Sequence, residues 1–395
     1  MPDFLTELAP TSNEFVELRR DIHQYPELSF AEHRTASLIA ARLQQWGYEV
    51  ESGIGGTGVA GCLRRGNGNR RLGIRADMDA LPITEATGKA YASRCDGVMH
   101  ACGHDGHTAM LLAAAHRIAL RGQINGTINL IFQPAEEGGA GARRMMQDGL
   151  FERYPCDAIF AMHNMPGIRS GHLVLRDGAS MASSDYVTAT LRGIGGHGAM
   201  PHQTRDPVVA AASIVMALQT IVSRNVDPQT MAVITVGALH AGQANNVIPH
   251  QATLEISVRS LDPNVRELLR ARIIALIQAQ AHSFGVDADV DWREGYSVLV
   301  NDPTQTAFAR NIAVELLGAE NVTLQGPPLS GSEDFAFMLE KVAGSYLLIG
   351  NGDGSGNAPA CMVHNPGYDF NDEILPIGAA YWTLLAERFL VEQDR

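Results

Sequence analysis

The spacing of apolar positions predicts helices that alternate with short strands in the first part of the chain. Apolar side chains recur at helical spacing in three segments, residues 14–23, 32–46 and 106–121. Short apolar runs typical of buried strands occupy residues 58–63, 72–75, 127–132 and 158–162. This alternation favours a largely parallel sheet covered by helices on both faces. We also expect Asp105 to cap the third helix.

The pattern changes in the middle of the chain. Strands are predicted at residues 185–192, 231–239, 252–259 and 288–296, with helices at 207–224 and 265–284. The order β-α-β-β-α-β is that of a ferredoxin-like domain. An α/β pattern then returns, with helices at 305–317, after Ser332 and at 377–392, and a strand at 345–349. We therefore expect an α/β fold with a mixed, mostly parallel sheet, formed by residues 1–182 and 298–395, and an inserted α+β domain, residues 183–297.

Composition narrows the class of protein. The 395 residues are 45% hydrophobic and 18% charged, as in globular proteins. The formal net charge of -13 opposes binding to nucleic acid or anionic membranes. The start of the chain carries Asp3 and Glu7 without an apolar run, unlike a signal peptide, and five cysteines without close pairing fit reduced thiols. We expect a soluble, cytoplasmic protein that acts on a small molecule.

The densest chemical motif is His100-Ala101-Cys102-Gly103-His104-Asp105-Gly106-His107. A thiolate and an imidazole two residues apart can face one metal, and a thiolate can bridge two. A second interpretation makes Cys102 a nucleophile activated by a nearby histidine. A third is a loop whose histidines are incidental. The motif alone favours these interpretations in that order.

Two adjacent carboxylates, Glu136 and Glu137, follow the strand predicted at residues 127–132. They project in different directions, so one can bind a metal while the other takes a proton from a water bound to that metal. A solvated acidic turn is the alternative. Ligands bind at the carboxyl ends of strands in open α/β sheets, which favours the chemical interpretation. Asp77 and His163 follow other predicted strands in the same way, and His364 lies in a late polar loop.

The middle section offers three further candidates. His197 lies in the glycine-rich turn at residues 195–202, where it can donate a hydrogen bond to a ligand or be part of a plain turn. Asn245, in the polar loop at residues 242–246, is a candidate for substrate binding, although a plain turn is the more common role. Arg259, at the end of a predicted strand, is a candidate partner for a substrate carboxylate, or a member of a surface salt bridge.

These motifs, in this order and spacing, resemble the amidohydrolase branch of the aminoacylase and carboxypeptidase metallopeptidase superfamily, which includes hippurate hydrolases and N-acyl-amino-acid amidohydrolases. The resemblance covers nearly the whole chain. Besides the Cys102 and Glu136 motifs and the His197 turn, it includes four segments: residues 21–29 (DIHQYPELS), 75–82 (RADMDALP), 331–335 (GSEDF) and 364–366 (HNP).

The resemblance implies a role for each matching residue. Cys102 would bridge two divalent metals, with His104 and His163 completing one site and Glu137 and His364 the other. Glu136 would be the general base, and Asp77 would orient a ligand. His197 would reach the substrate carbonyl in the partner subunit's site, so that the inserted domain serves as lid and dimerisation domain. A homodimer is therefore expected, with a tetramer as the alternative.

Together these features predict a binuclear metal-dependent amidohydrolase that cleaves N-acyl amino acids, hippurate-like or N-acetylated, into a carboxylic acid and a free amino acid. Mixed Cys, His and Glu ligands suit Zn, Mn, Co or Ni. One alternative is a metal-independent hydrolase that uses Cys102, which would leave Glu136, Glu137, His163 and His364 without a role. Another is a non-catalytic protein that binds metal or ligand, which would not need Glu136.

Overall fold

The computed structural model describes residues 4–354 and 361–391 and divides into two compact units. The first unit comprises the described residues up to Gly178, Val300–Pro327 and those from Asp334 onward; we call it the catalytic unit because it contains the predicted metal ligands. The second unit comprises Ala179–Leu299 and Pro328–Glu333. The short segment Pro328–Glu333 was not expected in the second unit; there, the Leu329 N–H donates to the Ser180 carbonyl (2.8 Å).

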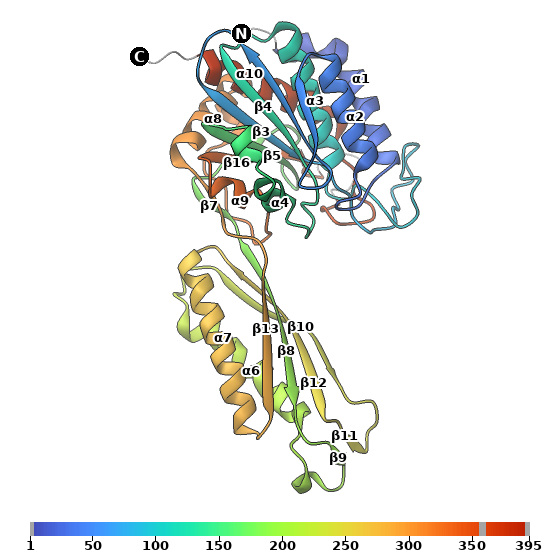
Figure 1. The fold of residues 1–395 in the computed structure, drawn as a ribbon, viewed down its shortest axis with the longest axis vertical. Helices are drawn as coiled ribbons and strands as arrows, with labels where there is room; N and C mark the ends of the chain where they lie inside the picture. The colour runs from blue at the N-terminus through green and yellow to red at the C-terminus, as the bar shows by residue number, and fades with distance from the viewer. Residues whose placement is uncertain (1–3, 355–360, 392–395) are drawn as a thin grey trace. The chain divides into compact units, whose positions relative to one another are not determined.

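An eight-stranded mixed sheet forms the centre of the catalytic unit (Figure 1). Its strands, in spatial order, are β1 (Glu49–Ile54), β2 (Gly58–Arg65), β4 (Gly126–Gln133), β3 (Arg71–Asp77), β5 (Ala158–Pro166), β16 (Gly344–Gly352), β6 (Leu173–Val174) and β15 (Val322–Thr323). The neighbouring strands β4, β3, β5 and β16 are all parallel. This confirms the α/β class with parallel strands at the centre of the sheet. Strands β7 (Gly178–Met181) and β14 (Leu299–Asn301) contain the unit boundaries.

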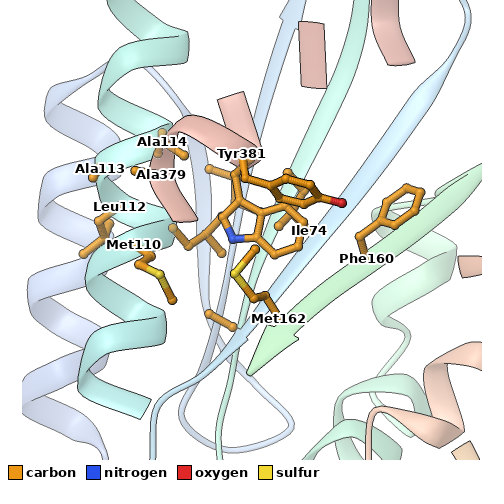
Figure 2. Close-up of a cluster of buried hydrophobic side chains, with 14 of the residues drawn as sticks. Ile74, Met110, Leu112, Ala113, Ala114, Phe160, Met162, Ala379 and Tyr381 are labelled. Carbon is orange, nitrogen blue, oxygen red and sulfur yellow. The ribbon is translucent and has the colours of Figure 1, made fainter. Parts of the chain in front are cut away.

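Helices surround this sheet and supply much of its core. They are α1 (Phe4–Gln24), α2 (His33–Gln45), α3 (His104–Arg121), α4 (Gly141–Gln147), α5 (Leu150–Arg153), α8 (Pro303–Leu317), α9 (Ala336–Leu339) and α10 (Leu375–Val391). Figure 2 shows side chains that pack between α3, α10 and the sheet, including Met110, Ile74, Phe160 and Tyr381. Because most residues of α10 are buried, this helix is a central part of the core.

The start of α3 differs from the expectation that Asp105 caps it. The helix begins at His104, and Gly103 before it has a φ of 90°, in the left-handed region that favours glycine. The Asp105 carboxylate contacts His23 (2.8 Å) and Arg19 (3.4 Å) instead of the helix amides. Two cationic partners in the core hold the carboxylate more strongly than a backbone N–H would.

The second unit has the ferredoxin-like order β8 (Ser183–Arg192), α6 (Pro207–Asn225), β10 (Ala232–Ala241), β12 (Gln251–Ser260), α7 (Pro263–Ser283) and β13 (Asp287–Glu294). Its four strands form an antiparallel sheet in the order β10-β12-β8-β13. Both helices begin with an Asp-Pro pair, in which the aspartate accepts a backbone N–H and proline fits the first turn. The buried faces of these elements form a separate hydrophobic core.

Two segments are long and apolar enough to cross a membrane, judged by length and composition only: α6 and residues 372–391, which include α10. Within the protein, 72% of the second segment is buried, as expected for a core helix. The corresponding share of α6 is 33%, because one face packs on its sheet. These two helices are therefore weak evidence for a membrane span.

Candidate metal centre

The carboxyl ends of the central parallel strands bring the predicted site residues of the catalytic unit together. Asp77 ends β3, Glu136 and Glu137 follow β4, and His163 lies in β5. Parallel neighbours end at the same edge of a sheet, so these side chains share one region. Cys102 comes just before α3, whose first residue is His104.

Several groups of donor atoms form among the described residues, and the atoms of each group lie within 4.8 Å of one another. Three of these groups contain at least two of the predicted metal ligands. These three groups are Cys102, His104 and His163; Cys102, Glu137 and His364; and His104, Glu136 and Glu137. Cys102 belongs to the first two groups, so its sulfur faces both sets of ligands. Its Sγ lies 3.3 Å from His163 Nε2, and Glu137 Oε1 lies 3.1 Å from His364 Nε2.

Two of these donor atoms are buried without a hydrogen bond. His104 Nε2 has no hydrogen-bond partner among the residues that the structure describes, and Glu137 Oε1 has only its ion-pair contact with His364. Leaving a buried polar atom unpaired costs about 1–3 kcal/mol, which a bound cation would offset. Thiolate, imidazole and carboxylate donors suit Zn, Mn, Co or Ni. The residues at this edge of the sheet therefore fit a pair of divalent ions.

Asp79 organises the loop that carries both glutamates. Its carboxylate accepts the backbone N–H groups of Glu136 and Glu137, each at 3.0 Å. His104 Nδ1 donates to the Asp79 carbonyl oxygen (2.9 Å), which leaves Nε2 facing the other donors. Ala135, just before the pair, has a φ of 52°, so the chain turns sharply after β4. In the sequence, Asp79 stands out only as part of the segment at residues 75–82. Its position shortly after a predicted strand was the one sequence feature that could have indicated a role.

Asp77 makes its closest contacts with residues other than the predicted ligands. Its Oδ1 accepts a hydrogen bond from His107 Nδ1 (2.6 Å), and its Oδ2 accepts one from Arg75 (2.8 Å). Its Oδ2 also lies 3.8 Å from His104 Nε2. Burial opposes ionisation of Asp77, but His104, His107 and Arg75 lower its pKa well below the usual value. His107 belongs to the His100–His107 motif, whose spacing alone indicates no particular role for it.

The electrostatic environment of the cluster favours cations. Burial, Glu137 and Glu136 raise the pKa of the Cys102 thiol well above its usual value. Burial alone would lower the pKa of His104, but nearby carboxylates, foremost Asp77, raise it to about 10. A thiol that resists ionisation is a poor nucleophile on its own, whereas a bound cation stabilises its thiolate.

The remaining predicted residues belong to the second unit. His197 is exposed in β9 (Gly196–His197), which pairs with β11 (Val247–Ile248), and its Nδ1 accepts the Ala199 N–H at 3.1 Å. Asn245 is exposed in the turn that leads into β11, so it shares this end of the unit with His197. Arg259 lies near the other end of β12 and donates to Ser332 Oγ (2.9 Å).

Comparison with known proteins places this arrangement among metallopeptidase relatives. Residues 73–388 match the sequence profile of peptidase family M20/M25/M40. The chain is 42% identical to the hippurate hydrolase of Campylobacter jejuni over 388 residues, which cover 98% of this chain and 100% of that one. It is 37% identical to the N-acetyl-L-cysteine deacetylase of Bacillus subtilis, covering 98% of this chain and 90% of the other.

A solved structure supports the same relationship. The YXEP protein of Bacillus subtilis, described as a dinuclear metal binding peptidase from the M20 family, superposes with a TM-score of 0.82 at 33% identity. The match covers 96% of this chain and 98% of that one.

Proposed function

The chain belongs to peptidase family M20/M25/M40 and is a metal-dependent hydrolase, as its motifs predicted, and from this premise we propose that it cleaves the amide bond of N-acyl amino acids. The products would be a carboxylic acid and a free amino acid. Hippurate and N-acetyl-L-cysteine, which appear in the names of two relatives, are both N-acyl amino acids with a free carboxylate. The observation that carries the proposal is the placement of Glu136 among the clustered donor atoms.

The proposed metal ligands are divided between two ions. Cys102 would bridge them, His104 and His163 would complete one site, and Glu137 and His364 would complete the other. The membership of Cys102 in two donor groups supports this division. When bound, divalent ions would supply Lewis acidity, which polarises a carbonyl group and makes water a stronger nucleophile near neutral pH.

Glu136 is the proposed general base. The residue is 7% exposed, and its carboxylate lies in one group with donor atoms of His104 and Glu137. Because Asp79 fixes the backbone of both glutamates, Glu137 can bind metal while Glu136 stays available for protons. Glu136 would take the proton of the attacking water and pass it to the departing amine nitrogen.

The second unit would supply substrate contacts. Arg259 and Asn245 are proposed to bind the substrate, with Arg259 as partner of its free carboxylate. His197 would stabilise negative charge on the carbonyl oxygen in the partner subunit's site, where one such donor contributes about 3 kcal/mol. Its exposure in β9 leaves the ring accessible for this role. The exposed apolar residues Val233 and Leu239, on the edge strand β10, support a homodimer formed through this unit.

The metal-independent alternative is disfavoured by the state of Cys102. The raised pKa of its thiol keeps it protonated in the absence of a cation. Such a mechanism also leaves the arrangement of Glu136, Glu137 and His364 without a purpose. A protein that only sequesters metal would not need a base such as Glu136 beside its ligands.

A substrate panel with metal exchange tests the proposal. N-acetyl-methionine, N-acetyl-cysteine and hippurate are assayed before and after chelation, and after restoring Mn, Zn, Co or Ni. We expect chelation to abolish hydrolysis and metal to restore it. Activity that survives chelation would refute the metal mechanism and favour Cys102 as nucleophile.

Two matched variants separate the roles of the adjacent glutamates. Glu136→Gln should retain both metals, measured by elemental analysis, while losing about 10²–10⁴-fold in turnover. Glu137→Gln should instead lose metal. Substantial turnover by Glu136→Gln would remove it from the base role.

Mixing two inactive variants tests the position of His197. If His197 acts in the partner's site, a Glu136→Gln subunit paired with a His197→Ala subunit forms one intact site. Random mixing of dimers would then restore about a quarter of wild-type activity. If His197 acts within its own chain, the mixture remains inactive.

A further inference from the structure

Asn164 is a fully buried residue that connects the proposed ligands Cys102 and His163. It follows His163 in β5. Its carbonyl oxygen accepts a hydrogen bond from His163 Nδ1 (2.6 Å), and its side-chain Nδ2 donates to the Cys102 carbonyl oxygen (2.6 Å). One residue therefore contacts two ligands that are far apart in the sequence.

These hydrogen bonds fix the hydrogen positions on two histidine rings. His163 Nδ1 must carry its hydrogen to donate to the Asn164 carbonyl, so Nε2 presents its lone pair towards Cys102 Sγ, 3.3 Å away. The Asn164 backbone N–H donates to His107 Nε2 (3.0 Å), so His107 donates through Nδ1 to Asp77. The backbone of Asn164 therefore sets the tautomers of both rings.

Tyr368 orients the side chain of Asn164. Its hydroxyl group, also fully buried, donates to Asn164 Oδ1 (2.6 Å), which turns Nδ2 towards the Cys102 carbonyl. The fit is tight around Gly103, because a Cβ there would lie 2.3 Å from Asn164 Nδ2 and 2.4 Å from the Tyr368 hydroxyl. Glycine at this position allows the Asn164–Tyr368 pair to approach the backbone beside Cys102.

We propose that Asn164 and Tyr368 are positioning residues that set the placement of Cys102 relative to His163 for the metal they share. This inference rests on the proposed assignment of these two ligands. Hydrogen-bonding partners outside the ligand shell typically contribute 10–100-fold to metal affinity, because they orient the ligands before metal arrives. The Asn164 side chain contacts Cys102 through the backbone carbonyl and not through the sulfur, and Tyr368 contacts Asn164, so their effect on metal would be indirect.

Cobalt titration of the metal-free protein tests this role without relying on activity. Co²⁺ binding is followed by equilibrium dialysis and by the thiolate-to-cobalt absorption band, which reports on Cys102. The variants are Tyr368→Phe, which removes one hydroxyl group, and Asn164→Leu, which removes the side-chain donor and acceptor at similar size. The matched control is Tyr381→Phe, a fully buried tyrosine of α10 that donates to the Ala309 carbonyl (3.1 Å).

We expect Tyr368→Phe to weaken one of two Co²⁺ binding steps about 10-fold and to change the thiolate band, with a larger loss for Asn164→Leu. Tyr381→Phe should lower thermal stability but leave both binding steps unchanged. If Tyr368→Phe and every folded Asn164 variant bind cobalt as the wild type does, the positioning role is refuted. If the wild type itself binds fewer than two ions or lacks the band, the proposed ligand assignment fails instead.

Discussion

His23 of α1 is protonated and lies between two carboxylates in the core of the catalytic unit. Its Nδ1 lies 2.8 Å from Asp105 Oδ2, and its Nε2 lies 3.3 Å from Glu85 Oε2. Burial opposes protonation of the ring, and so does Arg19, but Asp105 and Glu85 outweigh them and raise the pKa of His23 to about 9. The charged form is therefore part of the folded state at neutral pH.

The substitution His23→Gln keeps the approximate size and one donor but removes the charge. The unfolded chain binds this proton with a pKa of about 6.5, so the folded state binds it more tightly. The difference between these two pKa values, about 9 and about 6.5, corresponds to about 3 kcal/mol of stability from protonated His23. Because the folded pKa is raised, this stability is fully present below about pH 6.5 and is lost as the pH rises through 9.

Urea unfolding of the metal-free protein measures this contribution. Trp292 belongs to the second unit, so a Trp292→Phe background leaves fluorescence from Trp46 and Trp382, both in the catalytic unit. The difference in free energy of unfolding between this protein and its His23→Gln variant should shrink by about 3 kcal/mol from about pH 6 to pH 10.

A difference that stays constant with pH would refute a charged His23 as the source of stability. The control is His172→Gln. Burial and the neighbouring Arg169 lower the pKa of His172, so its substitution should give no loss of stability specific to high pH.

Three further substitutions test the fold by thermal and urea unfolding. Gly103→Ala should cost about 2–5 kcal/mol, since it adds left-handed strain and forces a Cβ against Asn164, and unaltered stability would contradict that packing. Arg75→Met should cost about 3–5 kcal/mol in free energy of unfolding, because the buried carboxylates of Asp77 and Asp334 both lose a cationic partner. Arg388→Met, which breaks an exposed ion pair, should cost no more than about 1 kcal/mol; a loss equal to that of Arg75→Met would undermine the distinction by burial.

Much of the fold can be predicted from the hydrophobic and polar pattern within individual segments. The alternating burial along β12 and the Asp-Pro starts of α6 and α7 are visible in the sequence. β1 was missed because its residues are mostly polar or exposed, and its pairing with β2 makes it a strand. α4 was also missed, since its seven residues are too few for a helical period to stand out.

The candidate site also contains residues that the sequence indicates and residues that only the structure reveals. The residue types of Cys102, Glu136 and Glu137, and the position of both glutamates after a predicted strand, are enough to indicate metal chemistry from the sequence. The sequence assigned no role to Asn164 or Tyr368, because their importance lies in hydrogen bonds between residues about 200 positions apart. A buried Asn or Tyr has no distinctive spacing in the sequence, so only the assembled fold reveals such contacts.

The position of α10 in the sequence also affects how the protein folds during its synthesis. The second unit is built almost wholly from one continuous stretch with its own core, so its folding can begin while the ribosome is still making the rest. The catalytic unit cannot complete its core until α10, which follows α3 by more than 250 positions, has left the ribosome and packed against α3. His364 joins the other ligands at about the same stage. A chain cut short before α10 would therefore lack part of its core and would not complete the proposed site.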